Sequence, residues 1–158
     1  MKSLIIFYSL DGNTRFLANE MAKEIGADLL ELKPEKSINA GNFMKYFWGG
    51  KQVMMNERPK LLAMENKPAD YELSIIGTPV WASNFAPVFK TFFSEVKIRD
   101  KKIGLFCSCG ASAGNAINNF RDELTGNNIL SEMVFINPLR KPEENSTIAK
   151  EWVRKMVQ

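Results

Sequence analysis

Short apolar runs alternate with longer segments of helical periodicity along most of the chain. The first run, residues 4–8, is too short for a helix and contains two isoleucines, which is typical of a buried strand. Beyond a polar loop, Leu17, Met21 and Ile25 repeat at helical spacing, and Gly26 follows where a helix would stop. This pattern predicts a strand, a short loop and a helix.

The same alternation continues to the end of the chain. Further strands are expected at 28–32, 71–77, 102–107 and 129–136, and further helices after Pro87, at 116–124 and at 148–156. Five apolar strands separated by helices predict an α/β fold, in which a doubly wound parallel sheet carries helices on both faces. The length of 158 residues suits one domain, so we expect residues 1–158 to form a single unit.

Residues 35–67 are harder to interpret. Aromatic side chains between Phe43 and Trp48 crowd one side of an expected helix. The simplest interpretation is the crossover helix that two parallel strands require. A lid or a partner-binding surface is the alternative, because aromatic residues and methionines are favoured in both. We favour the crossover helix.

Composition removes several classes of function. The chain has no histidine, so zinc hydrolase sites and Ser-His-Asp triads are excluded, and we expect no metal. The serine in the G-x-S-x-G pattern at 110–114 therefore has no base to activate it. The chain has a net charge of +3 but no dense basic stripe, so nucleic acid is not an expected partner. No apolar run approaches the ~20 residues that span a bilayer, so a membrane is not an expected partner either. Cysteine occurs only as Cys107 and Cys109, which indicates a reducing compartment, and we expect the cytoplasm.

The loop at 9–14 is the first candidate for chemistry. It joins a strand to a helix whose first amides have no partner within the helix and whose dipole favours negative charge. Ser9, Asn13 and Thr14 add side-chain donors, and Gly12 permits a tight turn. These features indicate a phosphate cradle. A helix cap at Ser9 or Asp11 explains the loop as well, whereas a hairpin at Asp11-Gly12 conflicts with the helical period that follows.

Two more loops are expected at the same edge of the sheet. Ligands of doubly wound sheets bind beyond the carboxyl ends of the strands, where the strand order reverses. The loops at 78–84 and 108–115 follow the third and fourth expected strands, and Trp81 offers a flat apolar wall. A mononucleotide with a large ring fits this set better than ATP, because no P-loop lysine is present.

The residues then resemble a family, the flavodoxins and their FMN-binding relatives. The sequence Tyr-Ser-Leu-Asp-Gly-Asn-Thr at 8–14 is similar to the family's phosphate loop, and Gly-Thr-Pro-Val-Trp at 77–81 is similar to the exit of its third strand. Residues 109–114 occupy the place of the third FMN loop. The resemblance covers nearly the whole chain. It implies strand order 2-1-3-4-5, a bound FMN and electron transfer in which FMN carries the redox chemistry.

The resemblance also assigns residues, with no protein side chain acting as a catalytic group. The phosphate is expected to bind the first loop, the ring to lie against the second, and the third loop to reach its pyrimidine side or opposite face. The first loop comprises Ser9, Leu10, Asp11, Gly12, Asn13 and Thr14; the second Thr78, Pro79, Val80, Trp81 and Ala82; the third Ser108, Cys109, Gly110 and Ala111.

Three features depart from the family pattern. Asp11 stands where the family often has a hydroxyl, so we expect its carboxylate to turn away while its amide still binds. The third loop has no aromatic residue, which argues against a two-sided aromatic sandwich. Electron-carrier flavodoxins are usually acidic, whereas this chain is mildly basic.

Three functions follow from these observations. The first is a flavodoxin-type electron-transfer protein that serves a redox partner protein or a small electron acceptor, as a monomer or weak dimer. The alternative is an FMN-dependent NAD(P)H oxidoreductase with a quinone-type acceptor. A remote alternative is a non-redox module that binds an anion or nucleotide in the same cradle.

Overall fold

The computed structural model describes residues 1–36 and 58–158. Strands and helices alternate along this part of the chain, with two short 3-10 helices, η1 and η2. In chain order the elements are β1 (Ser3–Phe7), α1 (Asn13–Ile25), β2 (Asp28–Glu31), η1 (Pro68–Asp70), β3 (Leu73–Trp81), β4 (Asn84–Phe85), α4 (Val88–Glu95), β5 (Lys102–Cys109), α5 (Ala116–Glu123), β6 (Asn128–Ile136), η2 (Pro138–Arg140) and α6 (Pro142–Val157).

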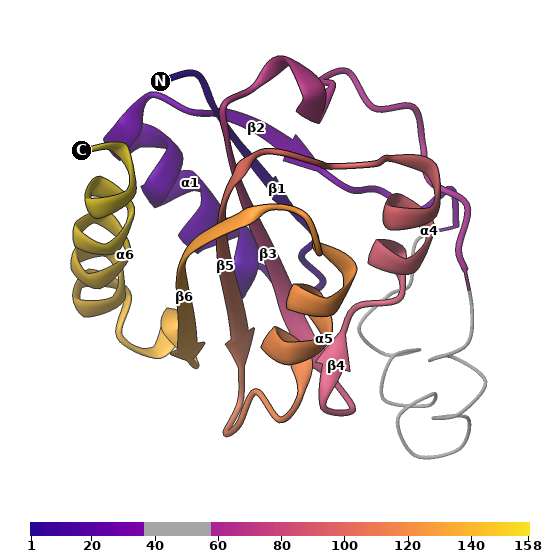
Figure 1. Ribbon diagram of the computed structural model, residues 1–158. Coiled ribbons are helices and arrows are strands. Elements are labelled where there is room, and N and C mark those ends of the chain that lie inside the picture. The colour runs from indigo at the N-terminus through magenta and orange to yellow at the C-terminus, as the bar shows by residue number, and fades with distance from the viewer. Residues whose placement is uncertain (37–57) are drawn as a thin grey trace.

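The sheet has the expected strand order. Its neighbours run β2-β1-β3-β5-β6, all parallel, which is the order 2-1-3-4-5 for the five expected strands. The short β4 pairs only with β3 and is antiparallel to it. Helices α1 and α6 cover one face, and α4 and α5 cover the other (Figure 1). The predicted doubly wound α/β fold is confirmed.

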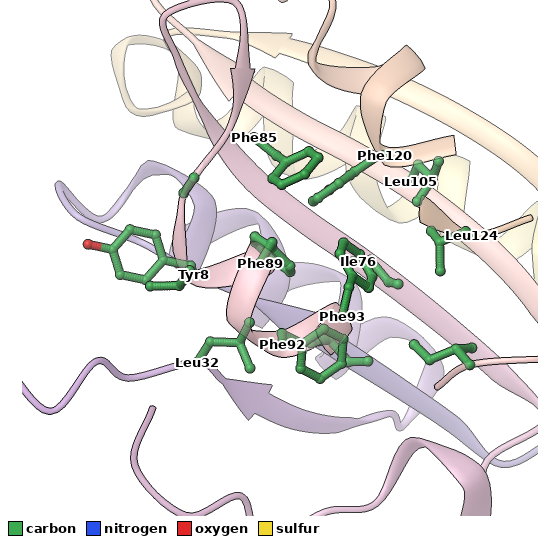
Figure 2. Packing of buried hydrophobic residues seen from close by; sticks show 14 of the residues in the cluster. Tyr8, Leu32, Ile76, Phe85, Phe89, Phe92, Phe93, Leu105, Phe120 and Leu124 are labelled. Atoms are coloured by element: carbon green, nitrogen blue, oxygen red, sulfur yellow. The ribbon is translucent and has the colours of Figure 1, made fainter. Parts of the chain in front are cut away.

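The two faces of the sheet carry separate cores. In β1, Leu4 and Ile6 pack toward α4 and α5, whereas Ile5 and Phe7 pack toward α1 and α6. This alternation is the period of two expected of a strand that is buried on both sides. On the first face, phenylalanines from α4 and α5 surround Phe85 of β4 (Figure 2), and the Phe85 and Phe120 rings stack at 4.9 Å.

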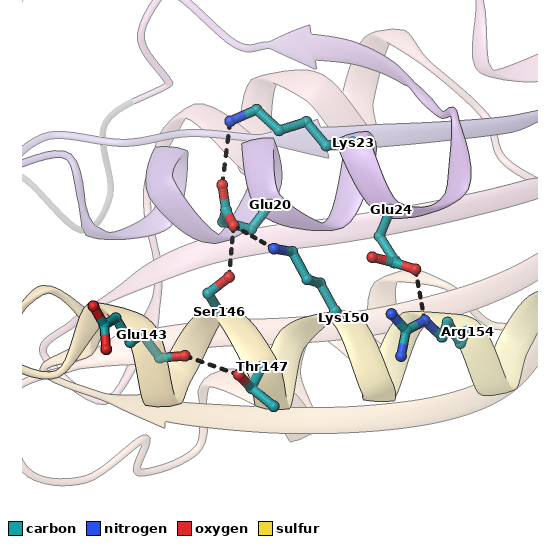
Figure 3. A network of polar contacts seen from close by, with 8 residues as sticks. All are labelled: Glu20, Lys23, Glu24, Glu143, Ser146, Thr147, Lys150 and Arg154. Carbon is teal, nitrogen blue, oxygen red and sulfur yellow. Dashed lines mark hydrogen bonds and ion pairs between the residues drawn. The ribbon is translucent and has the colours of Figure 1, made fainter.

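Polar contacts join α1 to α6 on the outside of the second core. The Glu20 carboxylate accepts a hydrogen bond from Ser146 Oγ at 2.5 Å and pairs with Lys150 at 2.9 Å. One turn along, Glu24 pairs with Arg154 at 2.6 Å (Figure 3). These contacts fix how the two helices lie against each other, and α1 begins at the candidate phosphate loop.

The segment after β3 differs from the expectation. The loop expected at 78–84 is wrong: β3 continues to Trp81, turns at Ala82-Ser83 and returns as β4, so this segment is a hairpin. The crossover helix and the alternative lid expected around 43–48 lie outside the described residues. Among the helices described, none is long and apolar enough to cross a bilayer.

Candidate functional site

The first loop leaves β1 and enters α1 through a left-handed glycine. Gly12 has φ +96°, and α1 begins at the next residue. A side chain at position 12 would be strained in this conformation, which explains why the tight turn carries glycine. A hairpin at Asp11-Gly12 is therefore wrong, and the expected strand–loop–helix is confirmed.

Two amides of this loop are held by side chains of the loop itself. The Gly12 N–H donates to Ser9 Oγ at 3.1 Å, and the Asn13 N–H donates to Asp11 Oδ1 at 3.1 Å. The carboxylate of Asp11 therefore folds back onto the loop. The cause is local, because a short acidic side chain readily caps the free amide two residues on. That it turns away from a bound phosphate stays a prediction.

Asn13 and Thr14 are engaged with other parts of the fold. Asn13 Oδ1 accepts the Leu139 N–H at 3.2 Å, which leaves its amide nitrogen as the group that can donate. Thr14 is fully buried, and its hydroxyl lies 2.8 Å from Ser108 Oγ, which is also buried. This hydroxyl pair ties the first loop to the end of β5.

The second segment is the β3–β4 hairpin. Trp81 is only 5% exposed, and its ring meets Tyr8 edge to face at 5.7 Å. Thr78 is buried, and its hydroxyl accepts the Ala86 N–H at 2.9 Å, so this side chain holds the chain beyond the hairpin. Ala82 and Ser83 form the turn with positive φ angles of 49° and 64°.

The third segment follows β5, and Asn137 closes it from the neighbouring strand end. Asn137 Nδ2 donates to the Gly110 carbonyl at 2.8 Å, and its N–H donates to the Cys109 carbonyl at 2.9 Å. Asn137 directly follows the strand expected at 129–136, and the sequence pattern assigns it no further role. Its left-handed φ of 45° is a conformation that asparagine tolerates better than most residues, and that tolerance is the one signal at this position.

The three segments meet around one cavity of about 360 Å³. This volume lies within the ~300–1,000 Å³ range of small-molecule sites. The cavity brings together nine of the expected site residues and adds Asn137: its lining is Leu10, Asp11, Asn13, Pro79, Val80, Trp81, Ser108, Cys109, Gly110 and Asn137.

The other expected site residues are not part of the lining. Three of them, Ser9, Thr14 and Thr78, are buried behind it. Gly12, Ala82 and Ala111 lie in the same three segments beside lining residues. The expected site residues and the cavity lining thus come from the same three chain segments, together with Asn137.

The phenol and the two thiols near the cavity have raised pKa values. Burial raises the pKa of Tyr8 to about 12, with the nearby Glu31 carboxylate acting in the same direction. Burial also raises the pKa of Cys107 to about 12 and the pKa of Cys109 above its ordinary value. The phenol and both thiols are therefore neutral at pH 7, and the Asp11 carboxylate supplies the negative charge among the lining residues.

Solved structures share this fold. A protein from Bacteroides uniformis ATCC 8492 is 21% identical with a TM-score of 0.81, covering 97% of each chain. A flavoprotein from Lactobacillus acidophilus NCFM, crystallised in complex with FMN, is 24% identical with a TM-score of 0.70 over 89% of this chain and 97% of that one. Oxidised flavodoxin 1 from Bacillus cereus is 16% identical with a TM-score of 0.60 over 99% and 97%.

The sequence itself also matches a family. No curated protein matches the chain. A family model described as flavodoxin, however, matches residues 2–156, which is nearly the whole length and includes all three segments around the cavity. The chain belongs to the flavodoxin family.

Proposed function

We propose that the protein binds FMN in the cavity between the first loop, the β3–β4 hairpin and the third loop, and that it transfers electrons through this group. The observation that carries the proposal is the meeting of a helix N-terminus, led by Gly12, with an apolar wall at Trp81 in one cavity. Family membership and the FMN complex of the Lactobacillus acidophilus flavoprotein support the same cofactor.

The residues present fit FMN in their chemistry. The first loop and the start of α1 would hold the phosphate through backbone amides, with the side-chain amide of Asn13 as a further donor in the cavity. Ser9 and Thr14, which are buried behind the lining, would support the loop. Pro79, Val80 and Trp81 would take one side of the ring, and the backbone of 108–111 would reach its polar edge. When bound, FMN supplies the redox chemistry, while these residues orient it and exclude water.

The amides that hold the phosphate must first be released. The Gly12 and Asn13 amides now donate to Ser9 and Asp11, and a phosphate oxygen would replace these acceptors. Hydrogen bonds to a charged group are worth roughly 1.5–3 kcal/mol each, against about 1 kcal/mol for neutral ones, so the exchange from the Ser9 hydroxyl favours the phosphate at the Gly12 amide. At the Asn13 amide, a phosphate oxygen replaces one charged acceptor with another.

The proposal is tested by titrating the apoprotein with FMN and with riboflavin. Absorbance and flavin fluorescence should report tight binding of FMN and at least tenfold weaker binding of riboflavin, because riboflavin lacks the phosphate. FAD should bind no better than riboflavin. A protein that FMN cannot reconstitute would remove the proposal.

The electron carrier is distinguished from the oxidoreductase by anaerobic stopped-flow mixing of the holoprotein with NADH and NADPH. A reductase must hold nicotinamide against the flavin at about 3–3.5 Å, whereas a carrier needs only an accessible ring edge. We expect slow or absent reduction by either nucleotide and ready reduction by dithionite. Flavin bleaching at tens per second would assign the NAD(P)H oxidoreductase instead.

The physiological donor or acceptor is a redox partner protein or a small electron acceptor. We place the protein in the cytoplasm, because Cys107 and Cys109 are free thiols, as a reducing compartment would keep them.

A further inference from the structure

The tip of the β3–β4 hairpin lies against the third loop at an unusually close approach. A Cβ atom added to Gly114 would lie 2.6 Å from Ser83 Cβ and 2.9 Å from Ser83 Cα, and closer still to Ser83 Oγ. Real Cβ atoms essentially never lie within 3.0 Å of a neighbouring heavy atom. Glycine at 114 is therefore required by the position of Ser83, as well as by its own φ of +52°.

Hydrogen bonds stabilise the same contact between the hairpin tip and the third loop. The Asn115 N–H donates to both Ser83 Oγ, at 2.9 Å, and the Ser83 carbonyl, at 3.1 Å. Beside it, Asn119 Nδ2 donates to Asn84 Oδ1 at 2.9 Å. Figure 1 shows the consequence: β4 and α5 lie side by side at the edge of the sheet where β3 and β5 end.

The hairpin tip adopts a conformation that its residues do not favour by themselves. A two-residue turn with both φ angles positive prefers sequences such as Asn-Gly, yet the tip here is Ala82-Ser83. Such a backbone persists only where its surroundings determine it. The contacts of Ser83 with Gly114 and Asn115 are the surroundings that do so.

This contact joins two walls of the cavity. Trp81, two residues before Ser83, and Gly110, four residues before Gly114, both line it. We infer that Ser83 and Gly114 form a latch that positions the Trp81 wall against the third loop and so sets the width of the slot for the flavin ring. The inference rests on the proposed function, and it makes Ser83 and Gly114 positioning residues.

Gly114→Ala tests the latch, and Gly126→Ala is its matched control. Gly126 also has a left-handed φ, +91°, but an added Cβ there meets only the end of Arg99, at 3.9 Å. Both variants carry the cost of a left-handed alanine, and only Gly114→Ala displaces the hairpin. We expect Gly114→Ala to weaken both FMN and riboflavin at least tenfold with the ratio of their affinities unchanged, since the latch acts on the ring. Gly126→Ala should change neither affinity by more than twofold.

A rescue separates the latch from damage to the third loop alone. Ser83→Gly removes the Cβ and Oγ atoms that the new methyl meets, so Ser83→Gly/Gly114→Ala should regain at least threefold of the lost affinity. The visible circular dichroism of bound FMN should change in Gly114→Ala and return toward wild type in the double variant. For the apoprotein, hydrogen exchange at the Asn115 amide should accelerate at least tenfold in Gly114→Ala and remain unchanged in Gly126→Ala.

Three outcomes would overturn the inference. They are equal affinities of Gly114→Ala and wild type, equal losses in Gly114→Ala and Gly126→Ala, and no recovery in the double variant. If Gly114→Ala does not fold, Ser83→Ala, which removes only the Oγ acceptor, must still weaken FMN and riboflavin equally, or the inference fails. Failure of wild-type protein to bind FMN is a separate result, which would remove the proposed function itself.

Discussion

Asp11 is the residue at which this chain departs most from an ideal phosphate loop. Its carboxylate lines the cavity and caps the Asn13 amide, so a bound phosphate dianion and this carboxylate would repel each other. Asp11→Asn keeps an oxygen that can accept the same amide and removes the charge. We expect the variant to bind FMN about fivefold more tightly, a change on the order of 1 kcal/mol, with riboflavin unaffected.

The measurement is the FMN and riboflavin titration of the apoprotein, repeated at several salt concentrations. Because salt screens the repulsion in the wild type, the advantage of Asp11→Asn should shrink as the ionic strength rises. An equal gain for riboflavin would contradict this explanation, since riboflavin carries no charge for Asp11 to repel.

The buried hydroxyl pair of Thr14 and Ser108 makes a second prediction for single residues. Thr14→Val leaves Ser108 Oγ buried without its partner, and an unsatisfied buried hydroxyl costs about 1–3 kcal/mol. Unfolding the apoprotein in urea should show a loss of this size in the free energy of unfolding. Thr14→Ser, which keeps the hydroxyl, should lose less.

A double-mutant cycle provides the control for this pair. Thr14→Val/Ser108→Ala removes both hydroxyls, so it should cost less than the sum of the two single changes. Additive losses would mean that the two hydroxyls do not depend on each other. The cycle uses the apoprotein, so that FMN binding does not contribute to the measured stability.

At the scale of elements, the strands and helices could be predicted because their apolar periods are unambiguous. Leu17, Met21 and Ile25 place α1, and the helix does end before Gly26, whose left-handed φ of 64° caps it. The order of the five main strands followed from the resemblance. Both depend on patterns that are local in sequence or shared by a family.

The hairpin could not be predicted, because no local sequence pattern marks its turn. Ala82-Ser83 has no turn signature, and the turn is held by Gly114 and Asn115, more than thirty residues away. Asn137 was missed likewise, because its contacts with Cys109 and Gly110 arise only when β5 and β6 pair. Long-range contacts of this kind determined the parts of the site that local sequence patterns missed.

The contact between α1 and α6 makes a prediction about acid. Hydrogen bonds from Ser146 and Lys150 lower the pKa of Glu20 to about 2 from an ordinary value of 4.5. A carboxyl whose pKa is depressed on folding stabilises the protein above its unfolded pKa, and that stability is lost as the pH falls through the folded pKa. The contribution of Glu20 should therefore disappear between about pH 4.5 and pH 2.

Glu20→Gln tests this contribution by urea unfolding of the apoprotein from pH 7 to pH 2. The full shift corresponds to about 3 kcal/mol, and screening near the surface reduces it, so we expect a loss of about 1–2 kcal/mol at pH 7. The difference from wild type should vanish toward pH 2. Glu144→Gln is the control, because both side chains of the Glu144–Lys141 pair are exposed. This variant should change the free energy of unfolding by no more than about 0.5 kcal/mol. A difference between Glu20→Gln and wild type that persists unchanged at pH 2 would exclude the ionised carboxylate as its source.

At the scale of the whole molecule, the two thiols should report two different events. Cys107 is fully buried in β5, which lies between β3 and β6, and its pKa of about 12 keeps it protonated, so it can react only when the core opens. Cys109 is half-buried in the cavity wall and can react from the folded state. Labelling with iodoacetamide, followed by mass spectrometry, separates the two. Cys109→Ser isolates Cys107, and Cys107→Ala isolates Cys109.

FMN should slow both reactions, by different amounts and for different reasons. A ligand that binds only the folded state reduces the unfolded population by the factor 1 + [L]/Kd, so FMN at a free concentration of 100 Kd should slow Cys107 about 100-fold. This factor should keep growing with FMN, provided that the core recloses faster than it is labelled. Protection of Cys109 should instead saturate once the cavity is filled, because its remaining reaction proceeds from the bound, folded protein. If Cys107 labelling is insensitive to FMN, β5 opens without global unfolding; if Cys109 stays unprotected, the third loop does not contact the flavin.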